Sequence, residues 1–495
     1  MTGLIKKVTV GTGYITLMNA MNLSISFTFY ILIARILTVD EVGTISLLFM
    51  ATAGFTTLTL LALNSAVIKF ISESLGMHNI GKASAAFWKS LKVASIAVLA
   101  SFMIVISILP YISLMVKLSA SLMLIAFATG LVLNYMSLLG GAFYGLWLYG
   151  LVALQNVIYF GVGRFSAVVL AKLGLGVQGV ALGVLAGALT SLIYSIFAFK
   201  GRLKRLSDPF PTRLLFSYSL PLYAMNVILF IQGWLDIALL YKLTNDLSAL
   251  GVYYLVVSSI YVLTVVPNSL AAVLFPTMGY RLGESGVESV KEILSVSMHL
   301  SLLFIAPISL ALAVASQTAL TIVYGARYAV GAMALTITSL AAIPASLYAL
   351  LASSLQALGY TKPMALAGLA SISTDVATLW LAVPMLSGIG AALARALMAV
   401  TAFAISYLVV RLKLGFSLKG WKRIIFYAIL TTMPMLILEH GIIMNVLTKG
   451  ILEFASFLAM VIILLKGLKL LDEREKSLIK KIVPSILKPL LRLIF

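Results

Sequence analysis

Apolar runs of about 20 residues follow one another along almost the whole chain, and each run contains few charged side chains. Only helices and closed barrels satisfy their backbone inside a bilayer, and these runs lack the alternating pattern of barrel strands. The chain is 62% hydrophobic and 10% charged, whereas soluble domains are about 45–50% apolar and about 25% charged. The sequence therefore predicts an all-α, polytopic membrane protein.

Reading each apolar run as one helix gives fourteen expected spans. The first span is too long and too polar for a cleaved signal peptide. The connecting loops are short, so they leave no room for a catalytic domain, and we do not expect an enzyme. The expected span limits are 13–36, 43–68, 92–116, 118–140, 150–171, 177–199, 215–241, 249–275, 293–315, 330–357, 363–384, 387–410, 424–442 and 448–466.

Lysine and arginine residues gather in every second loop between these spans. Five lie within 200–214 and five within 411–423. Cytoplasmic loops are rich in Lys and Arg, so we expect both termini in the cytoplasm, with 27 of the 35 basic residues on that side. The net charge of +20 is spread over many short loops, which favours an orientation signal over nucleic-acid binding. The basic, amphipathic tail 467–495 is expected to lie on the anionic inner surface of the cell membrane.

The chain contains two internal matches at a spacing of about 210 residues. RILTVDEVG at 35–43 resembles KLTNDLSALG at 242–251, because both have a basic residue, Leu-Thr, an acid and a closing glycine. GVQGVALG at 176–183 aligns with SGIGAALA at 387–394 at an offset of 211. Together the matches indicate a duplicated six-helix unit.

The two matches predict a parallel duplication of the first twelve spans. Because six is an even number, both halves begin on the same side, so the repeat axis runs along the membrane normal. The offset of 211 sets Arg164 opposite Asp375. Duplicated halves that rock against each other are typical of transporters. The expected limits are 1–200 and 201–423 for the two lobes, 424–466 for two additional helices and 467–495 for the tail.

Charged side chains inside membrane spans are costly and usually functional. Asp375 is the strongest candidate, because Ser371, Thr374, Asp375 and Thr378 form one polar stripe near mid-membrane. A role in an interior cavity or an ion pair is favoured there over simple packing. Arg395 lies on a helix face of small residues, which fits either a cavity wall or a buried structural pair with Asp375.

Four further charges lie within or near the ends of spans. Arg164 lies in the outer half of its span, where function and snorkelling toward the membrane surface are equally open. Asp236 lies about one turn from the outer end of its span. Arg35 points away from the polar stripe of its own helix, which favours snorkelling. Glu453 is near the outer end of the last span and is expected at the interface.

A cavity lined by the three arginines, Asp375 and Asp236 would offer three positive groups and two carboxylates. The planar fork of arginine suits phosphate, and hydroxyl and amide groups suit sugars, so an anionic glycolipid is permitted. Cysteine is absent, and the three histidines lie far apart in the sequence. We therefore expect neither a metal site nor a cofactor. The three histidines are His78, His299 and His440.

A series of apolar motifs runs through nearly the whole chain in a defined order. These motifs are IARILTVDEVGTISLL at 33–48, NSAVIKFISES at 64–74, SLPLYAMNVILFIQGWLDIALL at 219–240, LGVYYLVVSSI at 250–260, FPTMGYRLGES at 275–285, IVYGARYAVGAMAL at 322–335, LQALGYTKP at 355–363 and SGIGAALARAL at 387–397. Their order resembles that of polysaccharide flippases of the O-antigen repeat-unit type. These flippases belong to the multidrug/oligosaccharidyl-lipid/polysaccharide exporter superfamily.

The resemblance implies a two-lobed bundle with a central cavity that opens to each side in turn. Such flippases move a polyprenyl-phosphate- or pyrophosphate-linked oligosaccharide from the inner to the outer leaflet. Cavity arginines contact the phosphate in this family, so Arg395, Arg164 and Arg35 become substrate-binding candidates. Asp375 and Asp236 would be coupling-ion sites or ion-pair partners. The resemblance also implies contact with membrane lipids, glycan-assembly enzymes as candidate partners, and a monomer.

Three other functions remain open. A cation-coupled multidrug extruder of the same superfamily typically carries an acid within its first span, whereas this chain has none before Asp40. An integral-membrane glycosyltransferase or polysaccharide polymerase usually displays acids in a large outer loop. Here Asp40 and Glu41 lie side by side on a turn, which is more typical of a helix start. A scaffold without transport would leave Asp375 and Arg395 unexplained.

Overall fold

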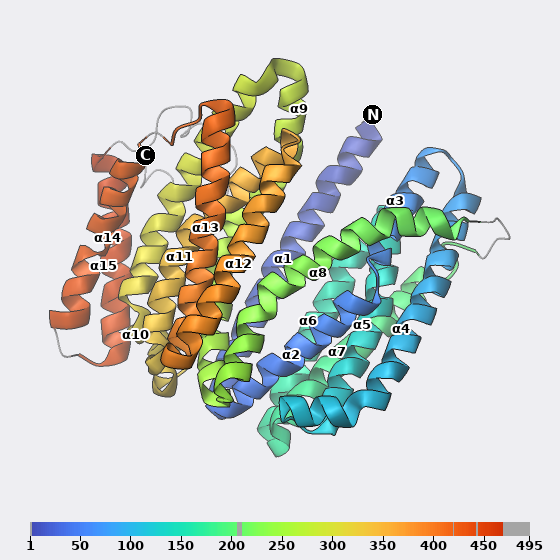
Figure 1. The fold of residues 1–495 in the computed structure, drawn as a ribbon, viewed down its shortest axis with the longest axis horizontal. Helices are drawn as coiled ribbons and strands as arrows, with labels where there is room; N and C mark the ends of the chain where they lie inside the picture. Colours follow the sequence, from blue (N-terminus) through green and yellow to red (C-terminus); the bar gives the residue numbers. More distant parts are fainter. Residues whose placement is uncertain (1, 205–209, 419, 442–443, 469–495) are drawn as a thin grey trace. The chain divides into compact units, whose positions relative to one another are not determined.

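In the computed structural model the described residues are 2–204, 210–418, 420–441 and 444–468, and they form helices and no strand (Figure 1). The prediction of an all-α fold is confirmed. The chain divides into two compact units, Met1–Ala238 and Leu239–Phe495. The predicted limits of the lobes concern the repeat in the sequence and stay a prediction. The basic tail from 469 onward lies outside the described residues.

The first unit is built from long helices with short connections. A π-helical turn, Ala171–Leu175, joins α6 to α7. The helices are α1 (Thr2–Ile36), α2 (Val39–Thr59), α3 (Leu63–Gly76), α4 (Ile80–Val116), α5 (Ala120–Gly145), α6 (Tyr149–Leu170), α7 (Gly176–Phe199) and α8 (Thr212–Thr244), the last of which crosses the limit of the unit.

The second unit begins with a long helical segment, α9 (Leu247–Val314), which is two helices joined at Gly286. Gly286 has φ 74° and ψ −169°, a conformation that favours glycine. The other helices are α10 (Ser316–Val323), the 3₁₀ turn η2 (Ala326–Gly331), α11 (Ala332–Ala357), α12 (Thr361–Leu386), α13 (Gly388–Leu414), α14 (Trp421–Gly441) and α15 (Val446–Gly467).

Thirteen described segments are long and apolar enough to cross a membrane. One of them, Tyr149–Phe199, contains both α6 and α7, so counting these two helices separately gives fourteen. Large apolar side chains are exposed along the spans, among them Phe165, Leu381 and Met385. Exposed apolar side chains of this size are suited to contact with lipid. The chain is a multi-pass membrane protein.

The predicted span 43–68 is wrong as a single helix. The helix stops at Thr59, and α3 starts at Leu63, because Leu61 and Ala62 have left-handed backbones with φ 54° and 53°. At this break the Tyr223 hydroxyl, from α8, donates to the Leu58 carbonyl at 3.2 Å. The sequence does not reveal this break, because Leu61 and Ala62 continue the apolar run and neither is a glycine, the residue that usually marks a left-handed backbone.

Helices α6 and α7 form a tight antiparallel hairpin. The residue numbers of the contacts fall along α7 as they rise along α6, which shows that the helices are antiparallel. The contacts are Gly187 with Gly163, Gly183 with Ala167, and Gly179 with the Leu170–Ala171 peptide. Small residues of this kind let membrane helices approach closely. The hairpin therefore depends on the absence of side chains at these positions.

Replacement of Gly187 tests that close approach. A Cβ built on Gly187 would overlap the Gly163 backbone, so Gly187→Val should force the helices apart. Overpacking of this kind costs about 1–3 kcal/mol of unfolding free energy, or more where backbone blocks relaxation. We expect a lower thermal unfolding temperature for Gly187→Val. Gly161→Val is the matched control, because its Cβ would meet nothing within 4 Å. Equal unfolding temperatures for the two variants would contradict the close packing.

Buried polar side chains also hold this hairpin to α5. Gln155 on α6 donates to the Met136 carbonyl at 2.8 Å and to the Ser195 hydroxyl at 2.9 Å. The Ser191 hydroxyl donates to the Gln155 carbonyl at 2.7 Å. In a bilayer these bonds satisfy groups that water cannot reach. Part of the polar character of α6 is therefore structural.

The two internal matches correspond to similar local structures. Thr38 caps α2 in a capping box with Glu41, and Asp246 caps α9 by accepting from the Ala249 amide at 3.0 Å. The hairpin turns also match, because Gly176 has φ 52° and ψ −133°, and Ser387 has φ 49° and ψ −125°. The acids of the first motif therefore serve at a helix start.

The hairpins differ by one residue. Gly179 lies against the Leu170–Ala171 peptide, whereas its counterpart Gly390 lies against the Ala382–Val383 peptide. Equivalent residues of the two hairpins are therefore 211 positions apart at Gly179 and Gly390, but 212 positions apart at Leu170 and Ala382, before the turn. The π-helical turn accounts for the difference, because it adds one residue to the first hairpin. Setting Arg164 opposite Asp375 is wrong by one residue, and Gly163 takes that place.

Candidate functional sites within the spans

Arg164 on α6 is held by aromatic rings from two other helices of the first unit. Its guanidinium carbon lies 4.3 Å from the ring centre of Phe29 on α1 and 4.7 Å from that of Phe49 on α2. The ring of Phe160, on α6 itself, lies at 5.8 Å. Each cation–π contact contributes roughly 0.5–2 kcal/mol. The rings favour a charge fixed inside the unit over one that snorkels to the membrane surface.

The guanidinium of Arg164 keeps hydrogen-bonding capacity after these contacts. Aromatic rings cover its faces, whereas its N–H groups project from its edges. Arg164 Nη1 is buried and donates to no acceptor among the described residues. A buried donor without an acceptor costs about 1–3 kcal/mol. An oxyanion such as a phosphate would supply the missing acceptor.

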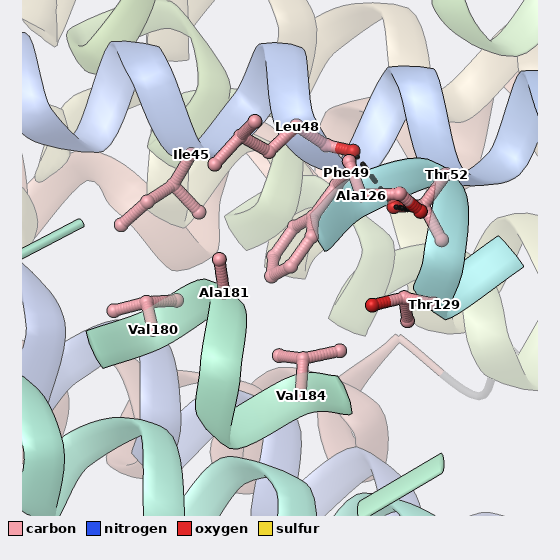
Figure 2. A pocket seen from close by; sticks show the side chains of 9 residues that line it. All are labelled: Ile45, Leu48, Phe49, Thr52, Ala126, Thr129, Val180, Ala181 and Val184. Carbon is pink, nitrogen blue, oxygen red and sulfur yellow. Dashed lines mark hydrogen bonds between the residues drawn. The ribbon is translucent and has the colours of Figure 1, made fainter. Parts of the chain in front are cut away.

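Phe49 also lines a small apolar pocket between α2, α5 and α7 (Figure 2). The Thr52 hydroxyl donates to the carbonyls of Leu48 and Ala126, and the Thr129 hydroxyl donates to the Ile125 carbonyl. These hydroxyls are therefore engaged by the backbone, and the pocket suits an apolar group better than a sugar. It is lined by Ile45, Leu48, Phe49, Thr52, Ala126, Thr129, Val180, Ala181 and Val184.

Asp375 and Arg395 lie on the two arms of one hairpin in the second unit. The hairpin joins α12 to α13, and Thr401 donates to Thr374 across it at 3.4 Å. Asp375 is 2% exposed. Arg395 Nε donates to the Tyr253 hydroxyl of α9 at 3.3 Å. Arg395 on α13 thus meets a buried phenol on α9, and Asp375 lies on the other arm, α12.

The remaining candidates occupy different surroundings. Asp236 on α8 is 2% exposed, and its Oδ1 accepts from the Ile237 amide at 2.9 Å. Arg35 is exposed in the last turn of α1, where a positive charge interacts favourably with the helix dipole. Arg35, Arg164 and Asp236 belong to the first unit, and Asp375 and Arg395 to the second. Their roles in binding or coupling stay predictions.

Glu453 is buried in the protein, and its predicted place near the outer end of the last span stays a prediction. Glu453 is 2% exposed, because α15 packs against α14 and α10. The sequence analysis considered Glu453 alone and did not connect it with Glu439 and Lys449, although the three residues flank one short loop between two spans. The hairpin geometry of those spans was the signal that would have joined them. Among the described residues, no group of three or more His, Asp or Glu side chains is arranged to hold a metal ion.

Comparison with known proteins identifies related sequences and folds. A family model described as "Polysaccharide biosynthesis protein" matches residues 8–280. The search of curated protein sequences finds no match. Among solved structures, the lipid II flippase MurJ in an inward closed conformation aligns with TM-score 0.73 and 14% identity, covering 92% of this chain and 99% of that chain.

Two other solved structures are similar at the same low identity. A multidrug resistance MATE family transporter of the MOP superfamily, inward-facing, aligns with TM-score 0.62 and 14% identity, covering 82% of this chain and 99% of that chain. A MATE transporter in a bent conformation aligns with TM-score 0.55 and 14% identity, and the alignment covers 83% of this chain and 96% of that chain. At this identity the likeness establishes the fold alone.

Proposed function

Because the chain belongs to the polysaccharide biosynthesis protein family, we propose that it is a flippase for lipid-linked oligosaccharide. It moves a polyprenyl-phosphate- or pyrophosphate-linked oligosaccharide from the inner to the outer leaflet by alternating access. The product serves the assembly of a surface polysaccharide or glycoprotein. The fold supports this proposal, because one structure that shares it is a lipid II flippase.

The single observation that carries the proposal is the state of Arg164. A permanently charged group is held within a membrane span by Phe29 and Phe49, and its buried Nη1 has no described acceptor. Arginine pairs with phosphate through two parallel N–H bonds. A substrate phosphate that arrives at this position would satisfy the donor and neutralise the charge. We therefore propose that Arg164 binds the phosphate of the carrier lipid.

The charges of the second unit fit a supporting role. We propose Arg395 as a further substrate-binding residue, with the Tyr253 hydroxyl orienting its guanidinium. We assign Asp375 the role of a coupling-ion or ion-pair residue, because its carboxyl group is buried within a membrane span. Asp236 is assigned the same class of role. Arg35 is retained as a substrate-binding candidate that meets the phosphate near the membrane surface.

The setting of the protein follows from the same proposal. It lies in the cell membrane with both termini in the cytoplasm, as the distribution of basic residues predicts. It acts as a monomer, without a cofactor and without nucleic acid. Glycan-assembly enzymes are the candidate protein partners, because they make and consume the translocated lipid. The chain carries out transport and not an enzymatic reaction.

A multidrug extruder is the second candidate, because MATE transporters share the fold. Such an extruder would bind organic cations, which a buried arginine repels. The absence of an acid in the first span before Asp40 also speaks against cation coupling there. A membrane glycosyltransferase or polymerase is the remaining alternative, and it would change the covalent structure of the glycan.

Ligand binding separates these candidates. The purified protein in detergent is titrated with a short-chain polyprenyl pyrophosphate oligosaccharide and, separately, with a cationic dye. A ligand present at 100 times its dissociation constant stabilises the folded state by about 2.7 kcal/mol. We expect the oligosaccharide lipid to raise the unfolding temperature and the dye to leave it unchanged. The reverse pattern would support the extruder, and a chemically altered glycan would support an enzyme.

A further inference from the structure

Polar side chains from three helices of the second unit meet at one end of the α14–α15 pair. Lys449 Nζ on α15 lies 2.5 Å from Glu439 Oε2 on α14, and it also donates to the Glu439 carbonyl at 2.8 Å. The Thr318 hydroxyl on α10 donates to the same Oε2 at 2.9 Å. Glu439 is therefore well supplied with donors.

Glu453 lies one turn after Lys449 on α15 and, unlike Glu439, has no described protein donor for its carboxyl oxygens. Its side chain is 2% exposed, and neither carboxyl oxygen accepts a hydrogen bond from a described protein donor. The Glu439 carboxyl group lies within hydrogen-bonding reach of it. Two ionised carboxylates can only accept hydrogen bonds. A bond between Glu439 and Glu453 therefore requires a hydrogen that no protein donor supplies.

The charge balance of the cluster leads to the same requirement. With both carboxyl groups ionised, Lys449 neutralises only one of them. The α10 helix, Ser316–Val323, contributes no charged residue, and on α14 the titratable neighbour of Glu439 in the sequence is His440. Burial of an unpaired ion is expensive, so such a group is neutralised or acquires a counter-ion. Two carboxylates, one of them already paired with Lys449, are too few ligands for a metal ion.

We propose that Glu439 and Glu453 form a proton-binding site in the helix pair that follows the two six-helix halves. The proton stays on the Glu453 carboxyl group, which donates a hydrogen bond to the Glu439 carboxylate. The other partners of that carboxylate are Lys449 and Thr318. This site lies outside the Arg164, Asp375 and Arg395 positions and does not depend on the transported substrate. Loss of the proton places an uncompensated carboxylate among α10, α14 and α15.

The packing around the site makes the proton structurally important. A Cβ on Gly450 of α15 would overlap the Ile322 side chain of α10, so these helices are in close contact beside the cluster. A second negative charge in that contact is repelled by Glu439 and cannot be solvated without separating the helices. Proton binding should therefore stabilise the contact of α15 with α10.

Infrared difference spectroscopy on the full-length protein in lipid nanodiscs tests the site. In sodium-free buffer at neutral pH we expect a protonated carboxylic-acid band that shifts in D₂O and disappears in Glu453→Gln. Glu288→Gln is the matched control, because that side chain is 82% exposed and lies far from the cluster in sequence. A band that persists in Glu453→Gln, or that sodium removes from the wild type, would overturn the proposal.

Hydrogen exchange supplies an independent readout. After correction for the intrinsic rise of amide exchange with pH, alkaline pH should lower the protection of 446–467 in the wild type, whereas Glu453→Gln, which resembles the protonated form, should keep its protection. If Glu453→Gln does not fold, Glu439→Gln replaces it in the infrared measurement. Lys449 is then left to pair with Glu453, so the acid band should again be lost. Protection of 446–467 that does not change with pH in the wild type, once intrinsic exchange is corrected for, would contradict the site.

Discussion

Arg164→Ala should lower the rate of lipid-linked oligosaccharide translocation by about two orders of magnitude. Removing one member of a buried, hydrogen-bonded charge pair costs about 2–5 kcal/mol, and each 1.4 kcal/mol corresponds to about a factor of ten. The loss follows from the placement of the charge by Phe29 and Phe49 and from the free Nη1 donor. The rate is measured in liposomes as the transfer of labelled glycan across the bilayer.

Arg164→Lys distinguishes geometry from charge. Lysine keeps the positive charge but lacks the planar fork and stacks less well on the rings, so we expect an intermediate rate. Arg281→Ala is the matched control, because Arg281 is exposed and pairs with Glu284 near the Gly286 bend. Both Arg164 variants should remain folded, and Arg164→Ala should unfold at a lower temperature because its contacts with the rings are lost. A wild-type translocation rate in folded Arg164→Ala would remove Arg164 from the substrate site.

Asp375→Asn should abolish translocation that is driven by an ion gradient. The side chain is buried on α12 at the hairpin that also carries Arg395. The substitution keeps the shape but removes the charge that would bind a cation or pair with an arginine. Transport is compared with and without imposed proton and sodium gradients, and we expect the variant to match protein-free liposomes under either gradient.

Two further variants decide how Asp375 acts. Asp246→Asn makes the same chemical change at an exposed helix cap, where asparagine caps as well as aspartate, so its activity should be normal. Asp375→Glu keeps the charge and should retain part of the gradient-driven rate. A folded Asp375→Asn variant with full gradient-driven transport would show that Asp375 has no coupling role.

The membrane spans were predictable because the thickness of the bilayer sets their length. Hydropathy therefore located the helices from residue 13 to residue 467, and the family motifs indicated the fold. The break after Thr59 was missed, because two left-handed residues that are not glycine leave no sequence signal. The π-helical turn before Gly176 was missed for a similar reason, since one inserted residue changes the offset of a repeat without disturbing its hydropathy.

Side-chain partners were less predictable than spans. The sequence singled out Arg164 but gave no reason to choose Phe29 and Phe49 among 24 phenylalanines, because their contact depends on how three helices pack. The place of Glu453 near the end of its span did not indicate that packing against α10 and α14 buries its side chain. Depth in a membrane can be read from sequence, but the face that a neighbouring helix covers cannot.

Direct translocation in reconstituted liposomes tests the flippase function most closely. A polyprenyl-pyrophosphate oligosaccharide labelled on its sugar is placed in both leaflets, and an external glycan-modifying reagent reports the fraction that can be reached. We expect wild-type protein to make nearly all the labelled lipid accessible with time and Arg164→Ala to do so about two orders of magnitude more slowly. Protein-free liposomes should stop at the outer-leaflet fraction. Wild-type liposomes that also stop at that fraction, while transporting a small cationic dye, would contradict the flippase and establish a drug extruder.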